Sequence, residues 1–324
     1  MALARMLSNS GREVTVWSAL PQEVDELSRT RRQKNLPGMV IPDEIKFTKE
    51  IAEACQDKDI ILFAVPSVFV RSTAKTAAAF IPDGQIIVDV AKGIEPDTLL
   101  TLTEVIADEL NKDGKHGNVH YVALSGPTHA EEVAKDLPTT IVSACEDQAV
   151  AEKVQDVFMN KNMRVYTNSD RLGVELCGAL KNVIALASGI CSGLGYGDNM
   201  RAALIIRGMA EIKRLGIKMG GKEDSFDGLA GMGDLIVTAT SKESRNNNAG
   251  YLIGKGKSAE DAKKEVGMVV EGINAIPAAL ELADKYDVEM PIVFAVDAVV
   301  NRGADARETV DALMLREKKS EMTK

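Results

Sequence analysis

One lysine lies inside a long apolar segment of this sequence. Between Leu176 and Ile190, Lys181 is the only ionisable side chain apart from Cys177. On a helix it would share a face with Ile184, about one turn further on. Burial disfavours the charged ammonium, so a lysine in these surroundings can serve as a base for proton transfer. The alternative is a lysine whose amine reaches water along its stem, and periodicity alone leaves both interpretations open.

Two polar segments further along the chain could complement such a base. Asp234 follows a glycine-rich stretch, where it could cap a helix or hold the amine of Lys181, and the cap is the simpler interpretation. Ser244, Arg245 and Asn246 could open a helix. Free backbone N–H groups, together with hydroxyl, amide and guanidinium donors, suit a phosphate dianion. The alternative for this second segment is a solvated turn.

Two more polar turns each follow a predicted strand in the first half of the chain. Lys92 comes after the apolar run 85–91, and Gly126 and Thr128 come after the run 119–124. In open α/β sheets the carboxyl ends of the strands meet at one edge, and ligands bind there. The two turns are therefore predicted to share a site, although each could be an ordinary connection.

These candidate residues need a scaffold, and the first half of the chain alternates strand-like and helix-like segments. Such alternation predicts a doubly wound α/β sheet, and strands that are apolar on both faces are typical of buried parallel strands. The predicted strands cover 13–17, 59–65, 85–91, 119–124, 139–143 and 163–167, and the predicted helices cover 48–56, 67–80, 95–111, 128–136 and 147–161.

From about Leu172 onward the strand pattern stops, and helices broken by glycine-rich turns follow. The length of 324 residues also favours two domains. We therefore predict a Rossmann-like, doubly wound α/β domain over residues 1–170 and an all-α domain over residues 171–324.

The beginning of the chain departs from the usual nucleotide-binding α/β domain. Such a domain opens with a strand, a GxGxxG turn, and a helix whose N-terminus binds the pyrophosphate. Here residues 1–11 resemble that helix, ended by Gly11, and no GxGxxG precedes it. We therefore expect a truncated chain that lacks the first strand and leaves two strand edges unpaired.

The end of the second predicted strand bears on the choice of cofactor in such a domain. An acidic residue there usually holds the ribose 2′-hydroxyl of NAD, but Trp17 is followed by Ser18 and no carboxylate. Arg29, Arg31 and Arg32 lie further on. This pattern mildly favours NADP as cofactor, or no preference between NAD and NADP, over a strict preference for NAD. The alternative is that these arginines belong to an exposed helix face.

Composition narrows the possible partners. The 39 basic and 48 acidic residues give a net charge of −9, which disfavours nucleic acid or an acidic membrane surface as partner. The four cysteines form no CxxC pair and the three histidines lack ligand spacing, so we expect no disulfide framework, no metal and a reducing, cytoplasmic location. We also expect no membrane span and no signal peptide.

Short motifs recur along almost the whole chain, and their order and spacing are more specific than any one of them. Together they resemble the NAD(P)-dependent glycerol-3-phosphate dehydrogenases of the bacterial type, over residues 2 to about 313. The motifs are NLPG at 35–38, AVPS at 64–67, AKGIE at 91–95, SGPT at 125–128, GVEL at 173–176, GALKNVI at 178–184, GYGDN at 195–199, LAGMGDL at 229–235, SRN at 244–246, VVEG at 269–272 and EMP at 289–291.

The resemblance implies reversible hydride transfer between glycerol 3-phosphate and dihydroxyacetone phosphate, with NAD or NADP as cofactor. It also implies a cytoplasmic homodimer that supplies phospholipid synthesis. In this family comparison Lys181 corresponds to the base at the C2 hydroxyl, Asp234 to the carboxylate that orients it, and Asn182 and Thr238 to polar neighbours.

The same resemblance assigns the binding residues. Lys92, Gly126 and Thr128 correspond to substrate contacts in the first domain, and Ser244, Arg245 and Asn246 to the phosphate site. The implied cofactor contacts are Lys92, Ala130, Arg245, Val269 and Glu271.

Two other functions stay open from the sequence. A relative acting on a β-hydroxy acid would reduce a β-keto acid and not dihydroxyacetone phosphate. A truncated chain that has lost its cofactor would be a non-catalytic interaction protein, and titration with NADH and NADPH would show no binding.

Overall fold

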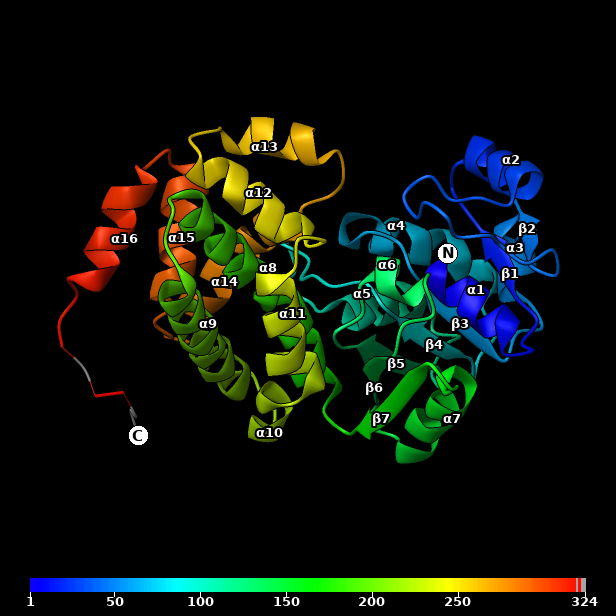
Figure 1. The fold of residues 1–324 in the computed structure, drawn as a ribbon. Helices are drawn as coiled ribbons and strands as arrows, with labels where there is room; N and C mark the ends of the chain where they lie inside the picture. Colours follow the sequence, from blue (N-terminus) through cyan, green and yellow to red (C-terminus); the bar gives the residue numbers. More distant parts are fainter. Residues whose placement is uncertain (319, 322–324) are drawn as a thin grey trace. The chain divides into compact units, whose positions relative to one another are not determined.

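The structure is a computed structural model that describes residues 1–318, 320 and 321. The chain forms two compact units (Figure 1). The first comprises Met1–Gly178 with Gly220–Asp234, and the second comprises Ala179–Met219 with Leu235–Lys324. The predicted α/β and all-α halves are both observed, while the domain boundary at residue 170 stays a prediction.

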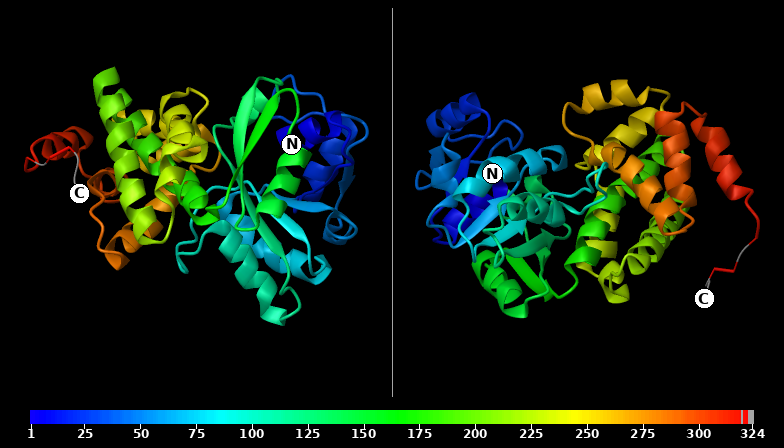
Figure 2. Two further views of the ribbon diagram at one scale, coloured as in Figure 1. Left: turned by 90° about the horizontal axis from the view of Figure 1, so that it is seen from below. Right: turned by 180° about the vertical axis from the view of Figure 1, so that it is seen from behind.

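The first unit is built on a five-stranded sheet in the order β3-β4-β5-β6-β7, and a separate pair joins β1 to β2. Every strand pair is parallel except β5 with β6. Figure 2 shows β6 and β7 side by side. The strands are β1 (Thr15–Trp17), β2 (Lys46–Thr48), β3 (Ile60–Phe63), β4 (Ile86–Asp89), β5 (His120–Ser125), β6 (Thr139–Ala144) and β7 (Met163–Asn168).

Both faces of this sheet are covered, as the predicted apolar strands require. In β4, Ile86 and Val88 belong to one buried cluster and Ile87 to another on the opposite face. The covering helices are α1 (Ala2–Asn9), α2 (Pro21–Thr30), α3 (Ile51–Cys55), α4 (Val70–Ala77), α5 (Leu102–Leu110), α6 (Ala130–Val133) and α7 (Gln148–Phe158), and α10 (Glu223–Asp227) is a further short helix of this unit.

Several predicted boundaries are wrong for local reasons. Helix α5 begins seven residues later than predicted, because Leu99 has a positive φ of 59° and Thr101 forms a capping box with Glu104. The short strand β2 and the helix α2 are absent from the prediction. The antiparallel pairing of β5 with β6 also departs from an all-parallel sheet.

Helix α1 is ended as expected at Gly11, which has a positive φ of 78°. The backbone N–H of Gly11 donates to Ser8, and that of Arg12 donates to Leu7, which is the pattern of a Schellman motif. Ala2 and Met6 are buried in the main core cluster of this unit.

The second unit consists of helices in the part of the chain that the structure describes. Helix α8 is long and apolar enough to cross a membrane by length and composition alone, but its apolar window is wholly buried inside the protein, so the described residues show no clear membrane span. Its composition is explained by burial in the core. The helices are α8 (Arg171–Gly193, beginning in the first unit), α9 (Asp198–Lys218), α11 (Asp234–Thr240), α12 (Arg245–Gly254), α13 (Ala259–Val266), α14 (Glu271–Lys285), α15 (Pro291–Asn301) and α16 (Ala306–Met314).

Helices α8 and α12 contact each other backbone to backbone. A Cβ atom on Gly189 would lie 2.1 Å from the carbonyl oxygen of Asn247, and one on Gly250 would lie 2.1 Å from that of Leu186. Only glycine allows this approach. The contact fixes the start of α12, where the predicted phosphate site lies, against the helix that carries Lys181.

We expect Gly250→Ala to lower the free energy of unfolding by about 3 kcal/mol, because the added methyl group forces the two backbones apart. Urea unfolding followed by circular dichroism measures this change. The control is Gly197→Ala, since a Cβ atom at Gly197 meets nothing within 4 Å. Equal stability of the two variants would contradict the packing argument.

Glu211 on α9 caps the start of α15. Its carboxylate accepts hydrogen bonds from the backbone N–H groups of Ile292, at 2.8 Å, and Val293, at 3.3 Å. Burial raises the pKa of Glu211 to about 7, and the two backbone donors and nearby Arg214 oppose this shift.

The raised pKa of Glu211 predicts a pH dependence of stability. Between pH 4.5, the ordinary value, and about 7 the folded state keeps a proton that the unfolded chain releases. The free energy of unfolding should therefore fall by on the order of 3 kcal/mol as the pH rises through this window. Urea unfolding at pH 5 and pH 7.5 tests this, and Glu211→Gln should remove most of the slope, whereas the exposed Glu260→Gln should keep it.

Candidate functional site

Lys181 is buried in the middle of α8, with 4% of its surface exposed. Of the two interpretations of this lysine, the structure therefore shows the buried one, and not the one in which the amine reaches water. The Nζ atom of Lys181 donates a hydrogen bond to the hydroxyl of Thr238 on α11. Ser188, two turns further along α8, donates to the carbonyl of Ala239 and so ties the same two helices together. The amine is thus held by a neutral hydroxyl inside the helical unit.

Asn182, next to Lys181, begins a chain of buried hydrogen bonds. The Nδ2 atom of Asn246 donates to Oδ1 of Asn182 at 2.9 Å, and Oδ1 of Asn246 accepts from the backbone N–H of Gly272 at 2.8 Å. Asn182 and Asn246 are 5% and 8% exposed. The amide of Asn246, predicted to bind the phosphate, thus contacts neighbouring helices through both its oxygen and its nitrogen.

The segment of Ser244 and Arg245 opens a helix, which is one of the two interpretations that the sequence left open. Ser244 is the N-cap of α12, and its hydroxyl accepts from the backbone N–H of Asn247 at 3.2 Å. The exposed Arg245 donates from Nη1 to the carbonyl of Val269 at 3.3 Å. The structure therefore brings together Arg245 and Val269, two predicted cofactor contacts. Glu271, a third, begins α14 two residues later.

Four of the predicted residues lie together in the first unit. Nζ of Lys92 contacts Oδ2 of Asp234 at 2.5 Å and the carbonyl of Gly126 at 3.1 Å. The hydroxyl of Thr128 donates to the same carbonyl at 3.0 Å. The two polar turns after β4 and β5 therefore share a site, as the topology predicted. The ammonium and the buried carboxylate together form a polar cluster at the carboxyl edge of the sheet.

Asp234 is not a helix cap. It has helical backbone dihedrals and continues the π-helical turn Leu229–Gly233 into α11, so no helix end is available for it to cap. Its carboxylate is 2% exposed and accepts from Lys92. The interpretation as a cap is therefore wrong, and the role of Asp234 toward Lys181 stays a prediction.

Two residues beside this cluster are missing from the predicted site. The hydroxyl of Ser125, at the end of β5, is buried and has no hydrogen-bond partner among the described residues. A Cβ atom on Gly178 would lie 3.3 Å from that hydroxyl and 3.4 Å from Cγ of Lys92. Their only sequence signal was membership of the SGPT and GALKNVI motifs.

Of the other residues predicted to bear on cofactor binding, some are exposed and one is engaged within its own loop. Ala130 begins α6 and is exposed beside the turn of Thr128. Arg31 donates to the carbonyls of Ile45, at 2.8 Å, and Pro42, at 3.2 Å, so its guanidinium is used within its own loop. Arg29 and Arg32 are exposed.

No group of three or more metal-ligating side chains occurs in the described part of the chain. Cys55, Cys145, Cys177 and Cys191 are all free and buried. Burial raises the pKa of Cys177 and raises that of Cys191 to about 11. Because the thiolate is the reactive form, burial disfavours reaction at these two thiols.

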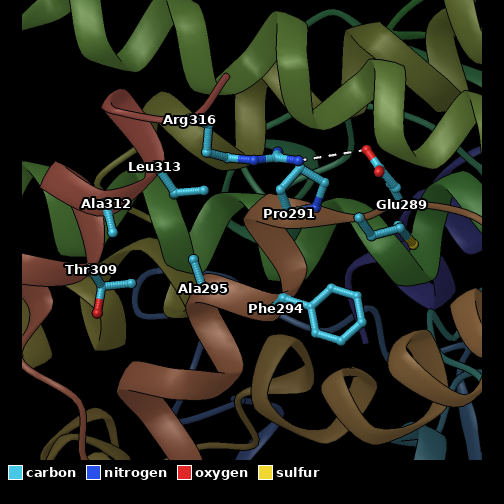
Figure 3. A pocket seen from close by; sticks show the side chains of 9 residues that line it. Glu289, Pro291, Phe294, Ala295, Thr309, Ala312, Leu313 and Arg316 are labelled. Carbon is cyan, nitrogen blue, oxygen red and sulfur yellow. Dashed lines mark ion pairs between the residues drawn. The ribbon is translucent and has the colours of Figure 1, made fainter. Parts of the chain in front are cut away.

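A hollow of about 490 Å³ lies between α15 and α16 in the second unit (Figure 3). Phe294 and Leu313 are among its apolar lining, and Arg316 faces Glu289 across it at 3.5 Å. None of the residues predicted for catalysis lines this hollow.

Known proteins resemble this chain along its length. It is 98% identical over 324 residues to glycerol-3-phosphate dehydrogenase [NAD(P)+] 2 of Lactobacillus delbrueckii subsp. bulgaricus, covering all of this chain and 96% of that protein. It is 50% identical to glycerol-3-phosphate dehydrogenase [NAD(P)+] of Fusobacterium nucleatum subsp. nucleatum. That match covers 99% of this chain and 95% of the relative. The crystal structure of glycerol-3-phosphate dehydrogenase from Coxiella burnetii matches with a TM-score of 0.92 at 34% identity, covering 97% and 95%.

Sequence models of one family match both halves. The model of the NAD-dependent glycerol-3-phosphate dehydrogenase N-terminus matches residues 1–151, and that of the C-terminus matches residues 170–311. The family matches give no support to the expected truncation, because the N-terminal model matches residues 1–151. The chain belongs to the NAD-dependent glycerol-3-phosphate dehydrogenase family.

Proposed function

We propose that this protein is an NAD(P)-dependent glycerol-3-phosphate dehydrogenase, which interconverts glycerol 3-phosphate and dihydroxyacetone phosphate. The observation that carries the proposal is the buried amine of Lys181, held by Thr238 in the same helical unit as Arg245. The amine of Lys181 is suited to accept the proton of an alcohol, and the guanidinium of Arg245 is suited to bind a phosphate. Relatives with that activity support the substrate.

Lys181 acts as the base. Oxidation of a secondary alcohol removes a hydride from C2 and a proton from its hydroxyl, so one base is enough. The amine donates to the hydroxyl of Thr238, which holds it in place, and its neutral form can accept that proton. In the reverse direction the ammonium returns the proton to the oxygen at C2.

Arg245 holds the phosphate. Its guanidinium is exposed at the start of α12, where the helix dipole also favours an anion. In the first unit, Lys92 is the predicted substrate contact that carries a positive charge, and Asp234 balances it there. Fixing the phosphate places C2 in one position for reaction, and such positioning supplies much of the rate.

The nicotinamide ring, when bound, supplies the hydride acceptor or donor. Features of the first unit fit such a cofactor, because the parallel strands β4 and β5 end side by side, just before the turns of Lys92 and Gly126. Lys92 and Ala130 are the residues of this unit proposed to hold it. The preference between NAD and NADP is not assigned.

We further propose that the enzyme is a cytoplasmic homodimer that supplies glycerol phosphate for phospholipid synthesis. The four unpaired cysteines support a reducing compartment. Exposed apolar side chains at α15 and α16, including Phe294, Met314 and Leu315, support a surface covered by a second copy. Light scattering of the purified protein tests the dimer.

The proposed activity is tested by following NADH and NADPH oxidation with dihydroxyacetone phosphate. We expect reduction of this substrate and none of a β-keto acid. Reduction of the β-keto acid alone would overturn the substrate assignment. Failure to bind either cofactor at millimolar concentration in calorimetry would leave the non-catalytic alternative, which the family matches do not favour.

A further inference from the structure

A second, inner hollow lies in the helical unit next to the one between α15 and α16. Its volume is about 220 Å³, and α8, α9, α15 and α16 all contribute to its lining. The two hollows adjoin, because both are lined by Pro291, Ala295 and Arg316. An apolar cavity of about 150 Å³ is already large enough to bind benzene. The inner hollow can therefore hold an apolar group that does not belong to the chain.

Contacts at its two ends fix the directions of the lining helices. At one end, Arg214 of α9 donates to the carbonyl of Glu289 at 2.8 Å, and Arg316, just after α16, lies 3.5 Å from the Glu289 carboxylate. At the other end, Arg307 near the start of α16 donates to the carbonyl of Leu194, which precedes α9, at 3.2 Å. Helices α9 and α16 therefore run in the same direction, and α15, which begins just after Glu289, runs the opposite way.

The end of the hollows at Glu289 is polar, and its charge is positive. Figure 3 shows Arg316 reaching toward Glu289 beside Pro291. Among the lining residues that the structure describes, Arg207, Arg214 and Arg316 stand against two carboxylates, Glu211 and Glu289. The carboxylate of Glu211 already accepts from the first N–H groups of α15. The excess of guanidinium groups suits an anion, above all a carboxylate.

The walls and the far end of the inner hollow are apolar. Ile190 of α8, Val299 of α15 and Val310 of α16 belong to its lining. From Ile292 to Val299, α15 extends about 10 Å along the hollow. None of the residues of α16, all of which the structure describes, is buried, so its apolar side chains lack close packing on this face. The space is thus elongated, apolar along its length and cationic at one end.

We propose that the inner hollow binds a single-chain anionic amphiphile, a fatty acid of medium length. Its carboxylate lies at Arg214 and Arg316, and its alkyl chain extends between α9, α15 and α16 toward Val299. An uncharged alkyl chain would leave the guanidinium groups unused, and a cationic amphiphile would be repelled by them. The proposal does not depend on the proposed function, because none of the residues predicted for catalysis or substrate binding lines this hollow.

Calorimetric titration of the purified protein with decanoate, below the concentration at which decanoate forms micelles, tests the proposal. We expect one decanoate to bind per chain. Decanol should bind at least tenfold more weakly, because it cannot form charge-assisted hydrogen bonds with the arginines. Decyltrimethylammonium, which has the opposite charge, should not bind.

Two variants locate the ligand. Ala295 is half-buried and lines both hollows, so Ala295→Leu fills the space and should weaken decanoate binding at least tenfold. Its control is Ala202→Leu, at an exposed position of α9 outside both linings, which should bind as wild type. Arg214→Gln should weaken decanoate about tenfold and leave decanol unchanged, and it decides the matter if Ala295→Leu does not fold.

Four results would overturn the proposal. Wild-type protein that binds no decanoate has no such site, and equal binding of decyltrimethylammonium would mean unspecific adsorption to apolar surface. Unchanged decanoate binding in both folded variants, Ala295→Leu and Arg214→Gln, would place the ligand elsewhere. If wild-type protein binds no decanoate and Ala295→Leu also changes the molar mass in light scattering, a second copy of the chain occupies the hollow.

Discussion

Replacement of Lys181 by alanine should lower kcat for dihydroxyacetone phosphate reduction by about a hundredfold or more, the usual effect of losing a general acid–base group. The amine lies buried against Thr238, and its loss leaves no ionisable side chain from Gly178 to Ile190 of α8. Steady-state kinetics gives kcat, and circular dichroism checks that the variant is folded.

Lys181→Arg distinguishes a base from a mere positive charge. The guanidinium keeps the charge but does not release a proton in the working pH range, so this variant should lose as much activity as Lys181→Ala. The exposed Lys218→Ala, in the same helical unit, should keep normal turnover. Near-normal kcat in folded Lys181→Ala or Lys181→Arg protein would show that the base lies elsewhere.

Replacement of Arg245 by alanine should weaken substrate binding and should not impair proton transfer. We expect the KM for dihydroxyacetone phosphate to rise about a hundredfold, because a charged partner of the phosphate contributes about 1.5–3 kcal/mol. Turnover at saturation should change much less. Initial rates over a wide range of substrate concentration separate the two constants.

Arg245→Lys keeps the charge but not the planar pair of donors, so its KM should lie between those of wild type and Arg245→Ala. Arg201→Ala, which removes a surface arginine paired with Asp198, should leave KM unchanged. Were Arg245→Ala to lower kcat and leave KM unaltered, the guanidinium would not be the phosphate ligand.

Sequence patterns predicted those features that depend on neighbouring residues. The apolar run around Lys181 offered burial as one of two interpretations, and the polar run at Ser244 offered a helix start as one of two; the structure shows both. The shared edge of parallel strands predicted that Lys92 and Gly126 lie together. In each case residues within a few turns of the chain, or one rule of topology, determine the outcome.

Features that depend on distant residues could not be predicted in this way. The amide of Asn246 contacts an N–H 26 residues further on, at Gly272, and no periodicity records that contact. The carboxylate of Asp234 accepts from a lysine 142 residues away, which the sequence presents only as a separate turn. Strand direction is equally hidden, because alternation of side chains is the same in parallel and antiparallel pairs.

The glycine contact between α8 and α12 has a consequence for engineering of this enzyme. A helix pair that touches through backbone atoms cannot be repacked by exchanging one side chain for another, so randomised libraries at Gly189 or Gly250 should return only the parent residue. A search for new substrates should instead vary exposed positions such as Arg245, where a change of side chain meets solvent and leaves the helices in place.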